Sequence, residues 1–203
     1  MPYLVPPLIP PGRLASSAQP LLPVADGLLL RPWQHADAPA VVAAFADPAI
    51  QRWHVRRADS EDEARDWIGQ WRDAWHNETA AHWAVVRPGA GEDTAADQVL
   101  GRISLRSMIL GIGHAECAYW TVPAARGQGV APRATGAVAR WAFDAMGFER
   151  LELVHSVTNE ASCRVALKSG FAPEGTRRHG HLHADGWHDM HVHARLRDDS
   201  FPG

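Results

Sequence analysis

The sequence predicts an α/β (α+β) fold: one domain in which a mixed, mostly antiparallel sheet of about seven strands is flanked by helices. Three observations lead to this prediction. A chain of 203 residues is long enough for one domain with a proper core and too short for two of ordinary size. Short β-favouring runs alternate with segments of helical spacing. Late in the chain, helices separate consecutive strands, which implies a parallel pair within the sheet.

Composition narrows the class of protein. Nine tryptophans and a hydrophobic fraction of 46% are typical of a folded globular chain. The net charge of −3 provides no general attraction to nucleic acid or anionic lipid. Cys117 and Cys163 fall inside an expected strand and helix, so we expect small buried side chains rather than a disulfide. With no membrane-length apolar run and no signal peptide, the expected location is cytoplasmic.

Residues 1–25 form a proline-rich arm, which we expect to be extended. We expect this arm to pack on the domain's own surface or on a partner subunit, because its apolar side chains would otherwise remain exposed to solvent. These side chains are Tyr3, Leu4, Val5, Leu8 and Ile9. The domain itself is expected over residues 26–198, followed by a tail at 199–203, and no internal repeat is visible.

The first half of the domain is predicted from capping and spacing. A strand at residues 27–31 precedes a helix that Asp37 is expected to cap and that ends near Asp47-Pro48. Ser60 and Glu63 have capping-box spacing, and the helix that they begin has an apolar face. That face comprises Ala64, Trp67, Ile68, Trp71 and Trp75. Strands are expected at 82–86 and 99–105, separated by a loop rich in Gly, Asp and Ala, and a turn at 108–113 leads into the central strand.

The central strand ends at Tyr119–Val122 and leads through a glycine-rich turn into a long helix. One apolar stripe predicts that helix, with Pro132 in its first turn and Gly147 after its last. The stripe consists of Ala134, Ala137, Val138, Trp141, Ala142 and Ala145. A further strand at 151–157 leads to Asn159 and a helix that ends near Lys168.

Gly127 and Gly129 lie where a helix N-terminus directs its unpaired N–H groups outward. Without side chains at these positions a bulky anion can approach the backbone, and the helix dipole favours phosphate. Many strand-to-helix turns carry glycine for packing alone, so the pair by itself is weak evidence. The third glycine of a dinucleotide fingerprint and the Gly-Lys-Ser/Thr of a nucleotide P-loop are both missing.

The order of these parts resembles the GNAT superfamily of acyl-CoA-dependent N-acyltransferases over roughly residues 27–196. The pyrophosphate loop of that family reads Arg/Gln-x-x-Gly-x-Gly/Ala, and this chain has Arg126-Gly127-Gln128-Gly129-Val130-Ala131. The Asn-x-x-Ser helix start and the Gly-Phe after the helix are similar to the branch of ribosomal-protein N-terminal acetyltransferases, RimJ/RimL-like. The resemblance implies transfer of an acetyl group from acetyl-CoA to a primary amine, on a protein N-terminus or a small molecule, by direct attack on the thioester.

The resemblance also implies where acetyl-CoA binds, in a cleft where the parallel strand pair splays apart. The loop at 126–131 would hold the pyrophosphate, and the backbone of Trp120, Thr121 and Val122 would pair with the pantetheine arm. Asn159 would bond the pantetheine as well, although it also suits a helix cap that needs no ligand. The residues implied for the loop are Arg126, Gly127, Gln128, Gly129, Val130 and Ala131.

Two residues are the candidates for proton transfer. Strand alternation puts Glu116 on the face of Ala118 and Trp120, where it could act as general base or simply pair with a neighbouring arginine. His114, on the same face, is a weaker alternate. Ser162 occupies the position of the branch's proposed thiolate acid and is otherwise an ordinary first-turn serine. The only tyrosines are Tyr3 and Tyr119, so serine or bulk water must serve.

Twelve histidines raise a metal hypothesis. Six of them lie in a C-terminal hairpin: His179, His181, His183, His188, His191 and His193. A two-residue Asp-Gly turn at 185–186 would put the two histidine sets on opposite faces, whereas a three-residue loop would bring them together. The sequence has no His-Glu-x-x-His motif and no complete set of Cys and His zinc ligands. We therefore expect the histidine rings to be exposed to solvent or hydrogen-bonded in the core, with no metal bound.

The acceptor is expected to bind at segments beside the cleft, and one aromatic and basic cluster could recognise an acidic peptide or a carboxylated small molecule. This cluster is Arg52, Trp53, His54, Arg56 and Arg57, for which helix packing with solvated arginines is the simpler interpretation. A non-catalytic acyl-CoA sensor that keeps the fold remains the alternative function, and a histidine-rich metal or nucleic-acid binder is a third. The chain is expected to be a monomer or a homodimer.

Overall fold

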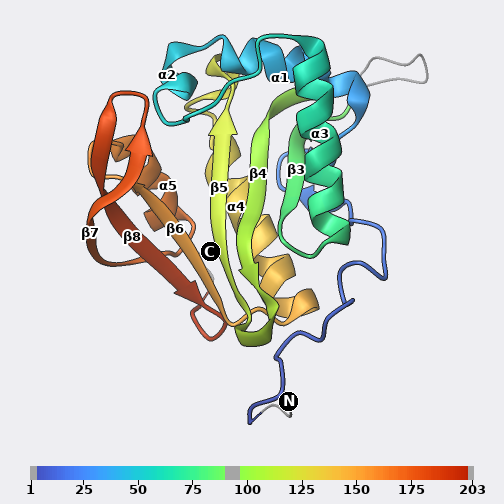
Figure 1. Cartoon of the computed structure of the whole chain (residues 1–203), viewed down its shortest axis with the longest axis vertical. Coiled ribbons are helices and arrows are strands. Elements are labelled where there is room, and N and C mark those ends of the chain that lie inside the picture. The colour runs from blue at the N-terminus through green and yellow to red at the C-terminus, as the bar shows by residue number, and fades with distance from the viewer. Residues whose placement is uncertain (1–3, 90–96, 201–203) are drawn as a thin grey trace.

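The computed structural model describes residues 4–89 and 97–200, which form one sheet flanked by helices (Figure 1). The sheet has eight strands in the order β1-β2-β3-β4-β5-β6-β8-β7. The strands are β1 (Leu22–Val24), β2 (Leu28–Pro32), β3 (Ala81–Arg87), β4 (Gln98–Ile109), β5 (His114–Thr121), β6 (Arg150–Ser156), β7 (Ala172–His183) and β8 (Gly186–Leu196). All neighbours are antiparallel except β5 and β6, which are parallel. The predicted fold class is confirmed; the eighth strand is β1, at the end of the predicted arm.

The helical elements cover both faces of the sheet. They are η1 (His35–Asp37), α1 (Ala38–Phe45), α2 (Pro48–Gln51), α3 (Glu61–His76), η2 (Leu110–Ile112), η3 (Pro123–Ala125), α4 (Val130–Arg140), the π-helical η4 (Trp141–Met146) and α5 (Glu160–Lys168). The helices α1 and α3 lie on one face and α4 lies on the other (Figure 1). Within the described residues, no helix has both the length and the hydropathy needed to cross a membrane.

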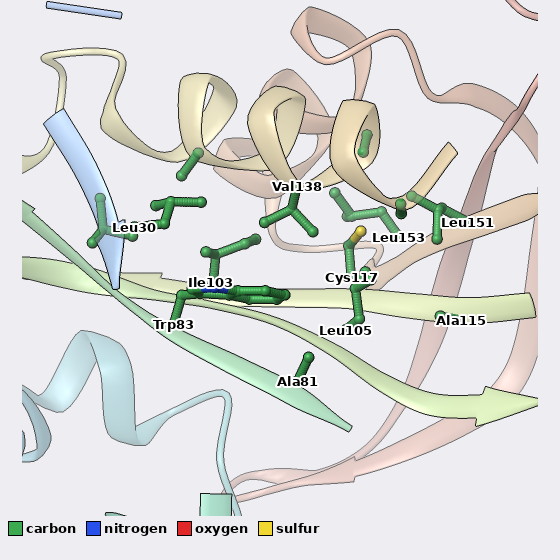
Figure 2. Close-up of a cluster of buried hydrophobic side chains, with 14 of the residues drawn as sticks. Leu30, Ala81, Trp83, Ile103, Leu105, Ala115, Cys117, Val138, Leu151 and Leu153 are labelled. Carbon is green, nitrogen blue, oxygen red and sulfur yellow. The ribbon is translucent and has the colours of Figure 1, made fainter. Parts of the chain in front are cut away.

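Each face of the sheet has its own core. On the α4 face, Val138 packs among side chains from β4, β5 and β6, including Leu105, Cys117 and Leu153 (Figure 2). On the other face, α1 and α3 bury an aromatic layer in which Trp33 and Phe45 pack against Trp120 of β5. The strand β5 is therefore covered on both faces, which fixes the direction of every side chain on it.

The β5–β6 pair is short. It runs from His114↔Arg150 to Cys117↔Leu153, and no pairing continues beyond it, so the strands diverge in Figure 1. The later residues of β5 remain paired with β4 alone. A stretch of β5 backbone in the middle of the sheet is thus left without a strand on its β6 side.

Two helix predictions need correction. Asp37 does not cap α1: its carboxylate accepts two hydrogen bonds of 2.8 Å from buried Arg31 and one of 2.9 Å from the amide of Gln34. The predicted long helix changes to π-helical winding at Trp141, which rotates its face so that Ala145 is exposed and Phe143 is buried. In contrast, the capping spacing at Ser60 is confirmed, because its hydroxyl accepts the amide of Glu63 at 3.2 Å.

The described part of the arm packs on the domain. Ile9 and Leu14 are buried, and Ile9 N donates to Leu110 O at 3.2 Å. Leu4 and Val5 remain exposed, and Tyr3 lies outside the described residues.

Candidate functional site

The turn from η3 to α4 presents a row of free amides. Gly127 and Gly129 have φ of +75° and +72°, a conformation that glycine adopts without strain. Among the described residues, the amides from Gly127 to Ala131 donate to no backbone or side-chain acceptor. A Cβ added at Gly127 would meet no atom within 4 Å, so the space in front of it is open. Five amides without a protein acceptor therefore lie at the N-terminus of α4, where the helix dipole favours a phosphate group.

The side chains of this turn support it rather than face the site. Arg126 donates from Nε to Thr121 O at 3.2 Å and forms an ion pair with Asp47. Gln128 donates to Ala124 O at 2.7 Å, and the carbonyl of Gln128 accepts from Arg133 at 2.6 Å. The backbone is thus held in place, and the donors are already oriented before any ligand arrives.

The three residues expected beside the pantetheine differ in which of their backbone groups are free to bond it. Trp120 has its ring buried in the aromatic layer, and its backbone is paired with Arg102 of β4. Thr121 uses its carbonyl for Arg126. Val122 is already bonded at both backbone groups, because its amide donates to Leu100 O at 2.9 Å and its carbonyl accepts from Ala125.

The N-terminus of α5 brings together a helix cap and two hydroxyl groups. Asn159 Oδ1 accepts the amide of Ser162 at 3.1 Å, so it does cap the helix. Tyr119 donates its hydroxyl to Ser162 Oγ at 2.9 Å, which leaves the serine proton free to be donated elsewhere. Burial raises the pKa of Tyr119 to about 12, and the hydrogen bond to Ser162 opposes that rise. Sequence reasoning passed over Tyr119; its alternation on β5 was the available signal, but only the packing of α5 shows the contact.

Glu116 lies on the predicted face of β5 and is ion-paired. Arg106 of β4 contacts its Oε1 at 2.5 Å through Nη2 and at 3.2 Å through Nε. The facing residue of β6, Glu152, binds Arg150 at 2.8 Å and Arg177 at 3.0 Å. These hydrogen bonds and charges offset the burial of Glu152 and lower its pKa.

The alternate candidate, His114, is engaged with that same charged row. Its Nε2 lies 3.6 Å from Glu152 Oε1. A base at this position would have to work beside a carboxylate that already has two arginine partners.

A Ser–His–Asp chain at the end of β6 was missed by sequence reasoning. Ser156 Oγ lies 2.7 Å from His188 Nδ1, and His188 Nε2 lies 2.8 Å from Asp185 Oδ1. Trp53 packs edge-on against His188, with ring centroids 6.1 Å apart. By strand alternation Ser156 shares the face of Glu152, so a second proton-transfer group lies on the Glu116 side of the sheet. No local motif marks this set, because its members come from β6 and the hairpin turn.

The hairpin turn explains how the histidines divide. Two residues, Ala184 and Asp185, join β7 to β8, one position earlier than the predicted Asp-Gly turn. His181 and His188 are consequently cross-strand partners, whereas His191 lies opposite His155 on the other face. The turn thus has two residues, but at a different place than expected, and it separates only His191 and His193 from the β7 histidines, because His188 lies against His183 with ring centroids 4.8 Å apart.

A hollow of about 210 Å³ opens on the α3 side of the sheet. It is lined by Phe45, His54, Val55, Arg56, Trp67, Gln70, Trp71 and Arg102. The guanidinium of Arg102 lies 4.9 Å from the ring of Trp71 and has no carboxylate partner among the described residues. Burial lowers its pKa to about 10, so it remains a cation at neutral pH.

Further donors around this hollow lack partners. Trp33 Nε1, Trp120 Nε1, His82 Nδ1 and Arg102 Nε find no hydrogen-bond acceptor within the described part of the chain. Burial lowers the pKa of His82 to about 3 and that of His54 to about 4, so both rings are neutral at pH 7. A half-buried cation without a carboxylate partner, beside aromatic rings, is an arrangement suited to an anionic group of a ligand.

A separate groove of about 550 Å³ runs along α4 from Pro132 and Arg133 toward Asp144, between α4 and β1. It begins directly after the free amides but does not include them.

Comparison with known proteins identifies relatives of this arrangement. A family model described as an acetyltransferase (GNAT) domain matches residues 27–172. An uncharacterized N-acetyltransferase, YoaA of Bacillus subtilis, is 28% identical over 154 residues, which are 75% of this chain and 84% of the relative.

Two solved structures share the fold. A RimL ribosomal L7/L12 α-N-protein acetyltransferase in complex with coenzyme A superposes with a TM-score of 0.77 at 19% identity, over 87% of this chain and 98% of that one. The microcin C7 self-immunity acetyltransferase MccE, in complex with acetyl-CoA and AMP, gives a TM-score of 0.75 at 16% identity, over 84% and 93%.

Proposed function

The chain belongs to the GNAT acetyltransferase family, and from this premise we propose that it transfers the acetyl group of acetyl-CoA to a primary amine by direct attack on the thioester. The observation that carries this proposal is the row of five free amides from Gly127 to Ala131 at the start of α4. Those donors suit the pyrophosphate of coenzyme A, and they are held in place by Arg126 and Arg133.

The rest of the cosubstrate would follow the unpaired part of β5. Beyond Cys117, β6 no longer pairs with β5, so an extended pantetheine arm can lie beside Trp120 and Thr121 in the place of a strand. The Trp120 backbone itself is paired with Arg102 of β4, so it would border the arm without bonding it. Val122 would contact the arm only by packing, because both of its backbone groups already form hydrogen bonds within the protein. Asn159 remains a candidate pantetheine ligand through its amide nitrogen, since its Oδ1 serves the helix cap.

Proton removal from the acceptor nitrogen and proton donation to the thiolate complete the reaction. The acceptor ammonium must lose one proton before attack, and the nitrogen loses a second as the amide forms. Glu116 is the proposed base, acting through water while Arg106 keeps the carboxylate in place. The departing thiolate takes a proton from Ser162, which Tyr119 then replenishes along their 2.9 Å hydrogen bond. No metal is needed for either transfer.

We propose that the acceptor carries a carboxylate or similar anion as well as its amine. Arg102 lines the hollow on the α3 side and lacks an anionic partner, and Arg56 lines the same hollow. One strand, β5, separates Arg102 from the β5–β6 opening, so anion and amine would be about 7 Å apart, one and a half strand spacings. A peptide N-terminus, a small amino compound of that length or another acidic amine meets this requirement.

Thiol release measured with a panel of amines tests the activity. We expect turnover with acceptors whose anion lies at that distance from the amine and weaker turnover with their amides. Tight coenzyme A binding without thiol release for any amine would instead support a non-catalytic acyl-CoA sensor.

Calorimetry tests the binding loop. Gly127→Ala and Gly129→Ala should weaken coenzyme A binding by at least about tenfold, because both residues have positive φ and a side chain would disturb the turn that presents the amides. A Cβ at Gly127 would enter open space, and one at Gly129 would lie 3.7 Å from the guanidinium carbon of Arg133. Gly27→Ala is the matched control, since Gly27 has φ +69° with open space around it but lies in the turn before β2. Equal losses in all three variants, or no loss in any, would contradict the proposed cradle.

A further inference from the structure

Four side chains with metal-binding atoms meet on the α5 side of the sheet, away from the Glu116 face. They are His155 of β6, Cys163 of α5, and His191 and His193 of β8. One ligand atom from each lies within 4.8 Å of the other three. Strand register explains the gathering: His155 is paired with His191, and His193 follows two residues later on the same face.

The hydrogen bonds of two rings determine where their protons are. His155 Nδ1 lies 2.8 Å from Ser156 O, and His193 Nδ1 lies 3.4 Å from Phe171 O. A carbonyl oxygen only accepts, so each Nδ1 carries the proton and each neutral ring has a lone pair on Nε2.

Those two Nε2 atoms face each other at a distance of 3.2 Å. Two lone pairs at this distance repel unless a cation lies between them. The rings are almost fully buried, with 5% and 2% of their surface exposed, and burial lowers the pKa of both. A proton is therefore a poor occupant near neutral pH, and a metal ion is a better one.

Cys163 completes the set. Its Sγ lies 4.0 Å from His193 Nε2, on the first turns of α5. In a tetrahedral zinc site the metal–nitrogen distance is about 2.0 Å and the metal–sulfur distance about 2.3 Å, which places ligand atoms roughly 3.3–3.6 Å apart. The described atoms need only a small inward movement to reach that geometry.

We propose that His155, Cys163, His191 and His193 bind one transition-metal ion in a tetrahedral Cys-His₃ site, with Zn²⁺ the expected metal. Zinc fits because thiolate and imidazole are its preferred ligands and four protein ligands close its coordination sphere. Binding converts the Cys163 thiol to a metal-bound thiolate and releases its proton to solvent. The two Nδ1–H···O=C bonds are the outer-shell contacts that orient metal-binding histidines.

The position of the site indicates a structural role. The metal would link the first turn of α5 to β6 and β8, and Cys163 directly follows Ser162. Metal binding would thus fix the hydroxyl that contacts Tyr119 while remaining outside the proton transfers. This inference replaces the expectation of no metal that sequence spacing favoured, since neither His155 nor Cys163 belongs to the histidine-rich hairpin.

Cobalt substitution of the full chain tests the site. Protein stripped with a chelator and titrated with Co²⁺ should develop tetrahedral d–d bands and a thiolate-to-cobalt charge-transfer band that saturate at one equivalent. Cys163→Ser should remove the charge-transfer band, and His155→Gln should weaken metal binding by at least about tenfold. Cys117→Ala and His181→Gln, a buried cysteine and a histidine outside the cluster, are matched controls that should bind as the parent does.

Thermal unfolding provides a second readout that does not depend on activity. Added Zn²⁺ should raise the Tm of the parent and of both control variants, and leave the Tm of Cys163→Ser and His155→Gln nearly unchanged. Circular dichroism checks that the variants are folded. The absence of a charge-transfer band in the parent, or equal metal affinity in parent and Cys163→Ser, would overturn the proposal whether or not the protein proves to be an acetyltransferase.

Discussion

At the scale of single residues, alternation along β5 predicted which side chains share a face but not which atoms they contact. Glu116 lies with Ala118 and Trp120 as expected, yet its Arg106 partner depends on how β4 pairs across the sheet. The Ser156–His188 contact likewise joins residues 32 positions apart. Local periodicity contains no information on such pairings, so the sequence could supply candidates for the site without their partners.

Replacing the two candidate bases separates their roles. Glu116→Gln should lower kcat by about 100-fold, within the range that a general base contributes. His188→Gln should change kcat by less than tenfold if Glu116 is the base. A large loss in His188→Gln with little loss in Glu116→Gln would transfer the role to the Ser156–His188–Asp185 chain.

Arg102 should show opposite effects on stability and on function. A half-buried arginine without an anionic partner and with an unsatisfied Nε destabilises the fold, so Arg102→Met should raise the Tm by removing an uncompensated charge. The same change should raise KM for an acidic acceptor by about 10–100-fold, which is the effect expected from losing a hydrogen bond to a charged group. Arg87→Met, at an exposed position of β3, is the control. An unchanged KM would show that Arg102 does not recognise the acceptor.

At the scale of elements, helix starts were predicted well where a cap is local and poorly where a distant charge competes for the same side chain. Ser60 caps α3 because its partner, Glu63, is three residues away. Asp37 has a suitable sequence position but is bound by Arg31, which β2 holds beside it. The change to π-helical winding at Trp141 has no counterpart in the residue pattern, and we have no physical account of why it begins there.

Asp37 and Ser60 should therefore differ in how much they contribute to the stability of the fold. Asp37→Asn should destabilise the fold by about 3 kcal/mol or more, because it leaves the Arg31 guanidinium partly unpaired in the interior. Ser60→Ala should cost only about 1 kcal/mol, the usual effect of losing a cap. Urea unfolding of both variants measures the difference, and similar losses would mean that Asp37 acts as little more than a cap.

At the scale of the whole molecule, the fold class and the parallel pair followed from the sequence, because the order of strands and helices leaves few topologies. The attachment of the N-terminal arm did not follow. One anchor is Glu78, a residue with φ +55° after α3, whose carboxylate accepts the amides of Gly12 and Leu14 at 2.7 Å and of Ala15 at 3.3 Å. Nothing near Glu78 in the sequence indicates that its partners are more than 60 residues away.

This anchor should make arm attachment depend on pH. Partial burial opposes ionisation of Glu78, but the three backbone hydrogen bonds outweigh it and lower its pKa below the ordinary 4.5. A carboxyl whose pKa is lower in the folded state stabilises that state fully above its unfolded pKa, and the stabilisation is lost as pH falls through the folded value. As pH falls through the lowered pKa of Glu78, the arm should therefore detach from the end of α3 before the sheet unfolds.

Limited proteolysis between pH 3 and 6, with a protease active over that range, measures arm release in the parent and in Glu78→Gln. Cleavage before Leu22 should increase at low pH in the parent, whereas Glu78→Gln should be cleaved at all pH values and show a flatter profile. His54 and His82, whose pKa values burial lowers to about 4 and about 3, reduce stability as pH falls below their ordinary 6.5 in both proteins. Their effect therefore cancels in the comparison. Glu160→Gln, an exposed carboxylate on α5, is the control, and a parent profile that matches Glu78→Gln would rule out the carboxylate as the anchor.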